Sequence, residues 1–231
     1  MISRVRKLQA IFFDLDGTLV DIHGPLYSAL CRALDSLGGP PLSREGYHES
    51  LSRDDLWPGV LGHQRREYMQ LAFAYFLTEI DGTERLEILP HVTETLAEIK
   101  RRSYVTGVVT SRPGDSDLLL RKLAMVGLAE HLDFVITQTN FSLAALDKTE
   151  SLREAAARAA VAPDDCMYVG DEPRDTVAAL KAGFGAAVSV TTGPATYSRL
   201  MQNDQFRPDF VIQSMGDLLG VIDRLRGSER D

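Results

Sequence analysis

The chain has 231 residues, of which 44% are hydrophobic and 25% charged, a composition typical of a soluble globular protein with one large domain or one domain and a smaller insert. Its formal net charge of −8 argues against nucleic acids and anionic membranes as main partners, but not against a small anionic substrate. Two distant cysteines, Cys31 and Cys166, argue against a disulfide framework or a zinc site.

The first residues of the chain predict no export signal. They are basic, but the apolar run at residues 11–13 that follows them is too short for a signal peptide. No run in the sequence approaches the roughly 20 apolar residues that a membrane-spanning helix needs. We therefore expect a cytoplasmic protein.

Six short apolar runs are predicted to be buried strands. They lie at residues 10–13, 104–109, 134–137, 166–169, 186–190 and 210–212. Amphipathic or alanine-rich stretches between them predict helices at residues 92–101, 116–126, 150–160 and 176–182. Ser151 and Glu154 have the spacing of a capping box at the start of the third helix. This alternation predicts an α/β fold, a doubly wound parallel sheet covered by helices on both faces.

One segment, residues 21–88, interrupts the alternation. It contains helical stretches at residues 26–37 and 64–80, with a loop between them, and no convincing strand. We therefore predict a small helical cap domain at residues 21–88. The α/β core domain is predicted to consist of residues 1–20 and 89–231.

Two carboxylates, Asp14 and Asp16, follow the first predicted strand. Residues two apart on an extended chain point to the same side, and the carboxyl end of a buried parallel strand faces the crevice where ligands bind. Two neighbouring carboxylates repel each other unless a cation or a proton intervenes. The pair therefore predicts a metal ion or a shared proton, although taken alone it is more typical of a plain acidic turn.

A second acidic motif, at residues 170–175, follows the fourth predicted strand. Asp171 lies at the strand end and Asp175 about one turn into the next helix, so both belong to the same edge of the sheet. Carboxylate oxygens are the ligands that Mg²⁺ prefers. We predict a Mg²⁺ site made by Asp14, Asp16, Asp171 and Asp175. The alternative is that Asp171 only caps the helix and Asp175 is solvated.

Two further side chains are predicted to face the same crevice. Thr110 follows the second predicted strand, and its hydroxyl is suited to bind a phosphoryl oxygen. Lys148 precedes the helix at residues 150–160 and supplies a positive charge. Taken alone, the first is typical of a turn residue and the second of a solvated surface lysine. Their place in an ordered series of elements favours a functional role.

The order of these motifs resembles the haloacid dehalogenase superfamily, in particular its phosphatases of the phosphoglycolate phosphatase-like kind. The resemblance covers residues 10–183 and implies a doubly wound core with a helical cap that selects the substrate. Its motifs in this chain are Asp14-Leu15-Asp16-Gly17-Thr18, Val109-Thr110-Ser111-Arg112, Lys148, Gly170-Asp171 and Asp175. The chain departs from frequent family patterns at three positions: Thr149 replaces a proline, Arg112 a lysine and His91 a glycine.

The resemblance implies a Mg²⁺-dependent phosphatase. Asp14 is implied to be the nucleophile that forms an aspartyl-phosphate, and Asp16 the acid and base whose backbone carbonyl also binds the metal. Thr110 and Lys148 are implied to stabilise the phosphoryl oxygens. Asp16 favours phosphate chemistry, because dehalogenases of this fold lack a carboxylate there. We also predict substrate contacts from Thr18, Ser111, Arg112 and Arg53.

Two other functions stay open from the sequence: a sugar phosphomutase of the same fold and a non-catalytic phosphate-binding protein. The expected partner is a small phosphorylated substrate, with phosphoglycolate, sugar phosphates, nucleoside monophosphates and pyrophosphate as candidates. Within the cap, four residues are candidates for substrate contact: Arg53, Asp54, Trp57 and His63. We expect a monomer or a homodimer.

Overall fold

The computed structural model describes residues 7–55, 60–82, 86–138 and 146–227. Its strands are β1 (Ala10–Phe13), β2 (Val105–Pro113), β3 (Phe134–Gln138), β4 (Cys166–Gly170), β5 (Ala186–Val190) and β6 (Phe210–Ile212). Its α-helices are α1 (His23–Ser36), α2 (Arg44–Ser52), α3 (Arg65–Gly82), α4 (Val92–Arg101), α5 (Ser116–Met125), α6 (Thr149–Ala159), α7 (Pro173–Ala182), α8 (Tyr197–Met201) and α9 (Leu218–Gly227).

The six strands form one parallel sheet in the order β3-β2-β1-β4-β5-β6. The chain winds outward from β1 through β2 to β3, and then from β4 through β5 to β6 on the other side. The direction of winding therefore reverses between β1 and β4. In open α/β sheets, ligands bind beyond the carboxyl ends of the strands at this point.

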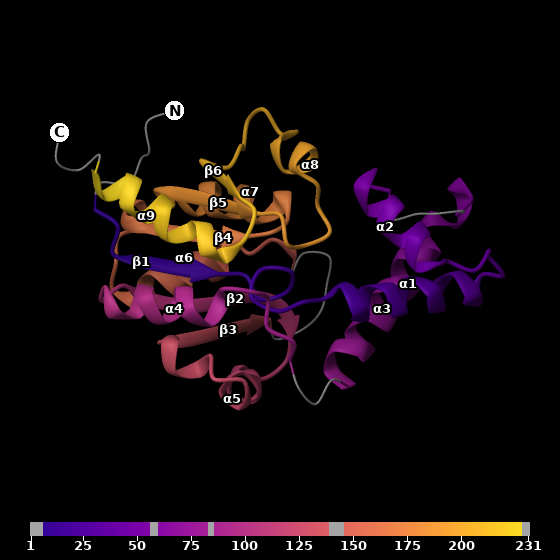
Figure 1. Ribbon diagram of the computed structural model, residues 1–231, viewed down its shortest axis with the longest axis horizontal. Helices are drawn as coiled ribbons and strands as arrows, with labels where there is room; N and C mark the ends of the chain where they lie inside the picture. The colour runs from indigo at the N-terminus through magenta and orange to yellow at the C-terminus, as the bar shows by residue number, and fades with distance from the viewer. Residues whose placement is uncertain (1–6, 56–59, 83–85, 139–145, 228–231) are drawn as a thin grey trace.

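Helices cover both faces of the sheet, as predicted for a doubly wound α/β fold (Figure 1). Helices α4, α5 and α9 share one apolar cluster with Ile11 and Phe13 of β1. Helices α6 and α7 share a second cluster with Ala10 and Phe12. Alternate residues of β1 thus point to opposite faces, as the pleat requires. The predicted fold class is confirmed.

Several predicted boundaries were wrong. β2 does not end before Thr110 but continues to Pro113, which pairs with Gln138 of β3 after an irregularity in the register. The proposed capping box of Ser151 and Glu154 does not exist, because α6 already begins at Thr149. The Asp147 carboxylate accepts the hydrogen bond from the Thr149 backbone N–H instead, at 3.0 Å.

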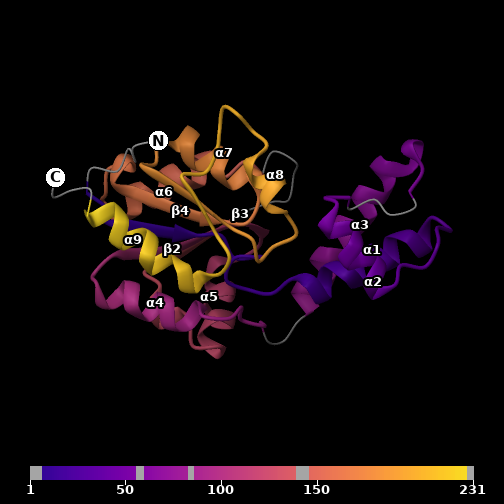
Figure 2. The same cartoon turned by 45° about the horizontal axis from the view of Figure 1, so that its top comes forward.

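Helices α1, α2 and α3 form a separate lobe beyond the carboxyl ends of β1 and β2 (Figures 1 and 2). The lobe has its own apolar cluster, which includes Leu30, Leu34, Tyr47 and Tyr68. Its helices lie within residues 21–88, the segment for which a cap domain was predicted, and the division of the chain into core and cap stays a prediction. The prediction missed α2 within its loop; Ser43 caps that helix by accepting from the Gly46 N–H at 3.0 Å.

No helix in the ranges that the structure describes is both long enough and apolar enough to span a membrane.

Candidate active site

Asp14 and Asp171 lie at the carboxyl ends of β1 and β4, on either side of the point where the sheet reverses its winding. The Asp14 N–H donates to the Val169 carbonyl at 2.8 Å, so the parallel ladder continues one residue past β1 and fixes Asp14 beside the end of β4. Asp175 comes from the first turn of α7. One carboxylate oxygen from each of the three residues lies within 4.8 Å of the other two, and all three side chains are buried.

Lys148 lies among these carboxylates. Its ammonium is 2.7 Å from a carboxylate oxygen of Asp14 and 2.7 Å from one of Asp175, and its side chain is only 2% exposed. The residue directly precedes α6, so the helix start holds its backbone in place. Three buried carboxylates therefore face the Lys148 ammonium and the nearby Arg174 guanidinium, which leaves one negative charge in excess.

Burial and the excess negative charge both raise the pKa values of carboxylates in the cluster. Burial raises the pKa of Asp14 to about 6, and Asp175 and Asp16 add to the shift while Lys148 opposes it. Burial, followed by the charges of Asp14 and Asp175, raises the pKa of Asp171 well above its ordinary value. Burial disfavours the charged form of Lys148, but the two carboxylates outweigh this and raise its pKa.

The backbones of two glycines, Gly17 and Gly193, pack directly against the side chain of Asp171. Gly17 has φ +76°, and a Cβ on it would lie 2.4 Å from Asp171 Oδ2. A Cβ on Gly193 would lie 1.8 Å from the same oxygen. The Thr18 hydroxyl donates to Asp171 Oδ1 at 3.2 Å, and the Thr192 hydroxyl donates to the Gly17 carbonyl at 2.6 Å. The turn after β1 and the loop after β5 thus hold Asp171 from two sides.

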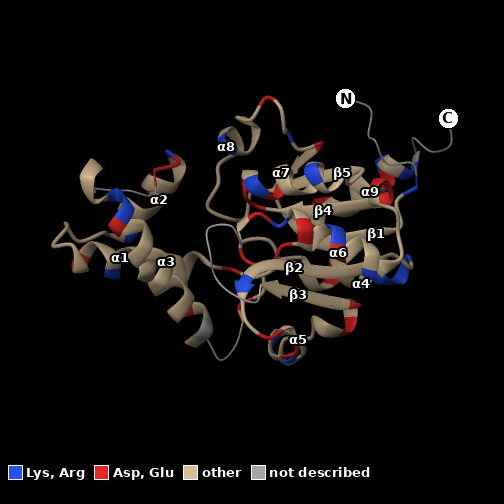
Figure 3. Cartoon of the chain, turned by 180° about the vertical axis from the view of Figure 1, so that it is seen from behind, with Lys and Arg blue, Asp and Glu red and all other residues tan. Residues whose placement is uncertain are grey.

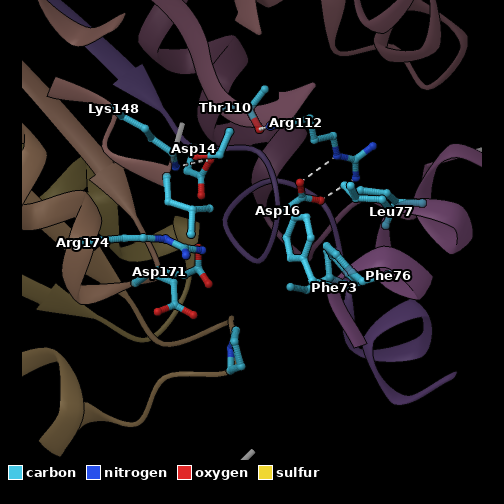
Figure 4. A pocket seen from close by; sticks show the side chains of 16 residues that line it. Asp14, Asp16, Phe73, Phe76, Leu77, Thr110, Arg112, Lys148, Asp171 and Arg174 are labelled. Carbon is cyan, nitrogen blue, oxygen red and sulfur yellow. Dashed lines mark hydrogen bonds and ion pairs between the residues drawn. The ribbon is translucent and has the colours of Figure 1, made fainter. Parts of the chain in front are cut away.

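Asp16 points away from the three-carboxylate cluster and toward Arg112 (Figure 4). Arg112 Nε donates to Asp16 Oδ2 at 2.7 Å, and a guanidinium nitrogen of Arg112 donates to Oδ1 at 2.5 Å. Arg112 is 7% exposed and Asp16 17%, so this two-bond pair is largely shielded from water. The guanidinium fixes the orientation of the carboxylate, because two parallel bonds define a plane.

The extension of β2 carries three polar residues into this region. The Thr110 hydroxyl accepts from the Arg112 N–H at 3.1 Å. Ser111 lines the same pocket, and its buried hydroxyl has no hydrogen-bond partner among the described residues. A buried polar atom without a partner is costly unless a ligand or water satisfies it. Ser111 is therefore placed to bind a polar group that enters the pocket.

One pocket joins most of these side chains, although not Asp175, with the helical lobe. The core side supplies the charged and polar lining, and α3 supplies apolar side chains opposite it (Figure 4). Its lining includes Asp14, Asp16, Thr110, Ser111, Arg112, Lys148, Asp171, Glu172, Arg174, Phe73, Phe76, Leu77 and Ile80. The cavity that these side chains enclose measures about 80 Å³.

A comparison with known protein families shows to which family the chain belongs. Residues 11–188 match the haloacid dehalogenase-like hydrolases, and this match covers more than half of the sequence. The chain belongs to this family. This match confirms the family resemblance that the motifs predicted. It also confirms the predicted class of enzyme, a hydrolase of this family.

Individual relatives are more distant. The chain is 26% identical to the pyrophosphatase PpaX of Bacillus mycoides over 230 residues, covering 96% of this chain and 100% of the relative. A haloacid dehalogenase-like family hydrolase from Streptococcus pneumoniae superposes with a TM-score of 0.67 at 21% identity, covering 93% of this chain and 98% of that one. A predicted phosphoglycolate phosphatase from Haemophilus somnus has a TM-score of 0.63 at 20% identity, with 96% and 100% covered. These structural likenesses support the fold.

The structure brings most of the residues predicted from the family motifs into one site. Thr18 lies beneath the pocket rather than in its lining, fully buried and bonded to Asp171. The cap candidates Arg53 and His63 are exposed, and neither is in the pocket lining; Arg53 pairs with Glu49 at 2.5 Å. The Asp54 carboxylate instead accepts from the Thr196 N–H at 3.0 Å, and Trp57 lies outside the described residues.

Sequence reasoning missed three features of the site in this hydrolase. Arg174 lines the pocket and extends toward Asp14 and Asp171; its position one residue before Asp175 in a family motif was the available signal. Gly193 touches Asp171, but a lone Gly-Pro step in a loop gives no hint of this. The sequence predicted a helix at residues 64–80 but did not single out the apolar residues through which α3 lines the pocket.

Proposed function

We propose that the chain is a Mg²⁺-dependent phosphatase that hydrolyses a small phosphomonoester through an aspartyl-phosphate on Asp14. The observation that carries this proposal is the cluster of three buried carboxylates around Lys148, with the Thr110 and Ser111 hydroxyls beside it. An anionic phosphate binds next to carboxylates only if positive charge accompanies it. Lys148 and Arg174 together do not balance the three carboxylates, so a divalent cation fits the charge of the site.

The donor set fits Mg²⁺ by its chemistry. Asp14, Asp171 and Asp175 offer hard oxygen ligands within 4.8 Å of one another, and Mg²⁺ bound by such carboxylates usually keeps several water ligands. When bound, the ion would neutralise the repulsion between an anionic nucleophile and the phosphate. The participation of the Asp16 backbone carbonyl as a further ligand stays a prediction.

In the proposed reaction, an Asp14 oxygen attacks phosphorus in line and displaces the alcohol oxygen of the substrate. Asp16 donates its proton to that leaving oxygen. It then removes a proton from the water that attacks the aspartyl-phosphate, which releases inorganic phosphate and regenerates Asp14. The hydrogen bonds from Arg112 hold the Asp16 carboxylate in one plane on the leaving-group side of the pocket.

The remaining polar groups stabilise the phosphoryl oxygens. Lys148 holds Asp14 by an ion pair of 2.7 Å and presents positive charge to the transferring group. Thr110 and Ser111 supply hydroxyl donors from the extended end of β2, and the unsatisfied Ser111 hydroxyl gains a partner when phosphate binds. These donors are fixed before the substrate arrives, so little reorganisation accompanies the reaction.

Metal dependence tests the proposal directly. We expect release of inorganic phosphate from an aryl phosphate to stop with a chelator and to resume with Mg²⁺. Mg²⁺ should also stabilise the metal-free protein against unfolding, by about 2.7 kcal/mol at a hundred times its dissociation constant. Thermal unfolding with and without Mg²⁺ measures this. An Asp171→Asn variant stabilised as much as the parent, or hydrolysis that withstands chelation, would contradict the proposal.

The position of Gly193 gives a second test. Gly193→Ala places a methyl group where Asp171 Oδ2 lies, because the added Cβ would be only 1.8 Å away. We expect a loss of at least about tenfold in kcat/KM and a weaker apparent affinity for Mg²⁺, both measured by phosphate release. The matched control is Gly220→Ala in α9, where an added Cβ meets nothing within 4 Å. Equal activity of the two variants would argue against a role for Asp171.

The products distinguish the phosphatase from the two alternatives. A phosphomutase would transfer the phosphoryl group of Asp14 to a second sugar hydroxyl, so isomerised sugar phosphate would accumulate in place of inorganic phosphate. A non-catalytic binding protein would release no phosphate from any member of a broad panel. We expect stoichiometric inorganic phosphate and free alcohol.

A further inference from the structure

Helix α3 carries two apolar stripes, and only one of them belongs to the interior of the helical lobe. The first stripe comprises Tyr68, Leu71, Ala72 and Tyr75, which pack in the apolar cluster shared with α1. The second comprises Phe73, Phe76, Leu77 and Ile80, which line the pocket. Both follow the spacing i, i+3, i+4, i+7 of one helix face. At 3.6 residues per turn, the centres of the two stripes are about 140° apart around the helix.

The second stripe faces the charged half of the site. Figure 4 shows Phe73, Phe76 and Leu77 across the pocket from Asp14 and Asp171, on the same side as Asp16. The three side chains are half-buried, so each keeps exposed apolar surface that the lobe itself does not cover. They therefore lie beyond the proposed acid Asp16, on the side where the alcohol part of a substrate would leave.

The α3 wall offers no charge to a substrate. No charged residue occurs in α3 between Tyr68 and Thr78, and Figure 3 shows this stretch uncoloured by charge. Within the pocket lining, the basic residues Arg112, Lys148 and Arg174 all come from the core. A second phosphate or a carboxylate placed against α3 would lose part of its hydration without gaining a partner from that helix, which is costly.

We propose that the alcohol part of the substrate is uncharged and apolar, an aromatic ring or an alkyl chain that packs on Phe73, Phe76 and Leu77. This inference rests on the proposed phosphatase function and narrows its substrate class. Among the candidates named from the sequence, it disfavours pyrophosphate and phosphoglycolate, whose leaving groups are anionic, and sugar phosphates, whose hydroxyls would face apolar side chains. The α3 stripe is the surface that makes this selection.

A series of phosphate esters tests the selection. The leaving groups of methyl, butyl and benzyl phosphate are uncharged alcohols, and none of them is strongly activated. The leaving groups of phosphoglycolate and pyrophosphate carry negative charge. With saturating Mg²⁺, we expect kcat/KM for butyl and benzyl phosphate to exceed that for methyl phosphate by at least about tenfold, because added methylene groups contribute this much in an apolar pocket. Phosphoglycolate and pyrophosphate are expected to fall below methyl phosphate.

Variants of the stripe assign the effect to α3. Phe76→Ala and Leu77→Ala should each lower kcat/KM for benzyl phosphate by about tenfold and leave that for methyl phosphate nearly unchanged. The control is Thr78→Ala, on the exposed side of the same helix, which should change neither. Circular dichroism and thermal unfolding verify that each variant is folded. If Phe76→Ala does not fold, the more conservative Phe76→Leu replaces it in the comparison.

The outcomes separate the inference from the function on which it rests. A preference for phosphoglycolate or pyrophosphate over benzyl phosphate would overturn the inference and leave the hydrolysis of phosphate esters standing. Equal losses on methyl and benzyl phosphate in the α3 variants would also overturn it, because they would indicate a purely structural role. No phosphate release from any compound in the series would overturn both.

Discussion

An Asp14→Asn variant is expected to lose at least about a thousandfold in kcat on any phosphate ester, because an amide oxygen is far too weak a nucleophile to replace the carboxylate. Inorganic phosphate release at saturating Mg²⁺ measures the loss. Trapping adds a second readout: the parent should retain covalent phosphate after rapid acid quenching, and the variant should not. These results would identify Asp14 as the site of phosphoryl transfer.

The same substitution is not expected to unfold the metal-free protein. Burial raises the pKa of Asp14 from 3.8 to about 6, so the folded state binds a proton more tightly than the unfolded chain does. The stability from this group is present below pH 3.8 and is lost as the pH rises through about 6, a difference of about 3 kcal/mol. Asn carries no such charge and avoids that loss at neutral pH.

Urea unfolding of metal-free protein from pH 4 to pH 8 measures this. The parent should lose more stability than Asp14→Asn across the window, while the exposed control Asp35→Asn should follow the parent in both activity and stability. Substantial turnover by Asp14→Asn would contradict the nucleophile. An inactive variant that is also much less stable than the parent at pH 7 would show that misfolding, and not the loss of the nucleophile, causes the loss of activity.

The meeting of Asp14 with Asp171 followed from local patterns in the sequence. Both residues come directly after short apolar strands, and the carboxyl ends of parallel strands share one edge of a sheet. The strand order that makes β1 and β4 neighbours is not encoded in either segment. The structure establishes it through the pairing of Phe13 with Val169.

Arg112 shows where local patterns fail. The apolar run that predicted β2 ends at Val109, yet the strand continues to Pro113, because Pro113 pairs with Gln138 of the neighbouring β3. Pairing between strands that are distant in sequence thus sets the length of β2. It carries Arg112 into reach of Asp16, a contact between residues 96 positions apart.

Helix α2 escaped prediction, and the pocket-facing stripe of the correctly predicted helix α3 was not singled out, for opposite reasons. Only Tyr47 and Ser50 of α2 are buried, so its sequence has little apolar periodicity to detect. In α3, two apolar stripes on well-separated faces largely cancel the periodic signal of each other. One face serves the lobe and the other the pocket, and a pattern read from the chain alone does not separate them.

Replacing Lys148 is expected to damage both stability and activity. Lys148→Met keeps an unbranched side chain of similar length but removes the ammonium that lies 2.7 Å from both Asp14 and Asp175. The buried carboxylates then lack their counter-charge, and breaking a buried ion pair in this way costs about 3–5 kcal/mol. Turnover should fall by about a hundredfold or more, because a fixed positive group beside the phosphoryl oxygens is lost.

The loss of stability should depend on pH and on metal. Without Lys148 the carboxylates hold protons more tightly, so the difference in unfolding free energy from the parent should shrink as the pH falls and carboxylates become neutral. Mg²⁺ should recover part of the stability, because it supplies positive charge to the same oxygens, but not the activity. Urea unfolding at pH 5 and pH 8, with and without Mg²⁺, measures these differences.

Lys181→Met provides the matched control, because Lys181 is an exposed lysine on α7 and its loss should change stability by less than about 0.5 kcal/mol. A Lys148→Met protein as stable as this control at pH 8 without metal would show that the cluster does not need the ammonium. In that case Asp14, Asp171 and Asp175 would have to share protons in the metal-free protein. The charge argument for a divalent cation at this site would then fail, whatever the activity of the variant.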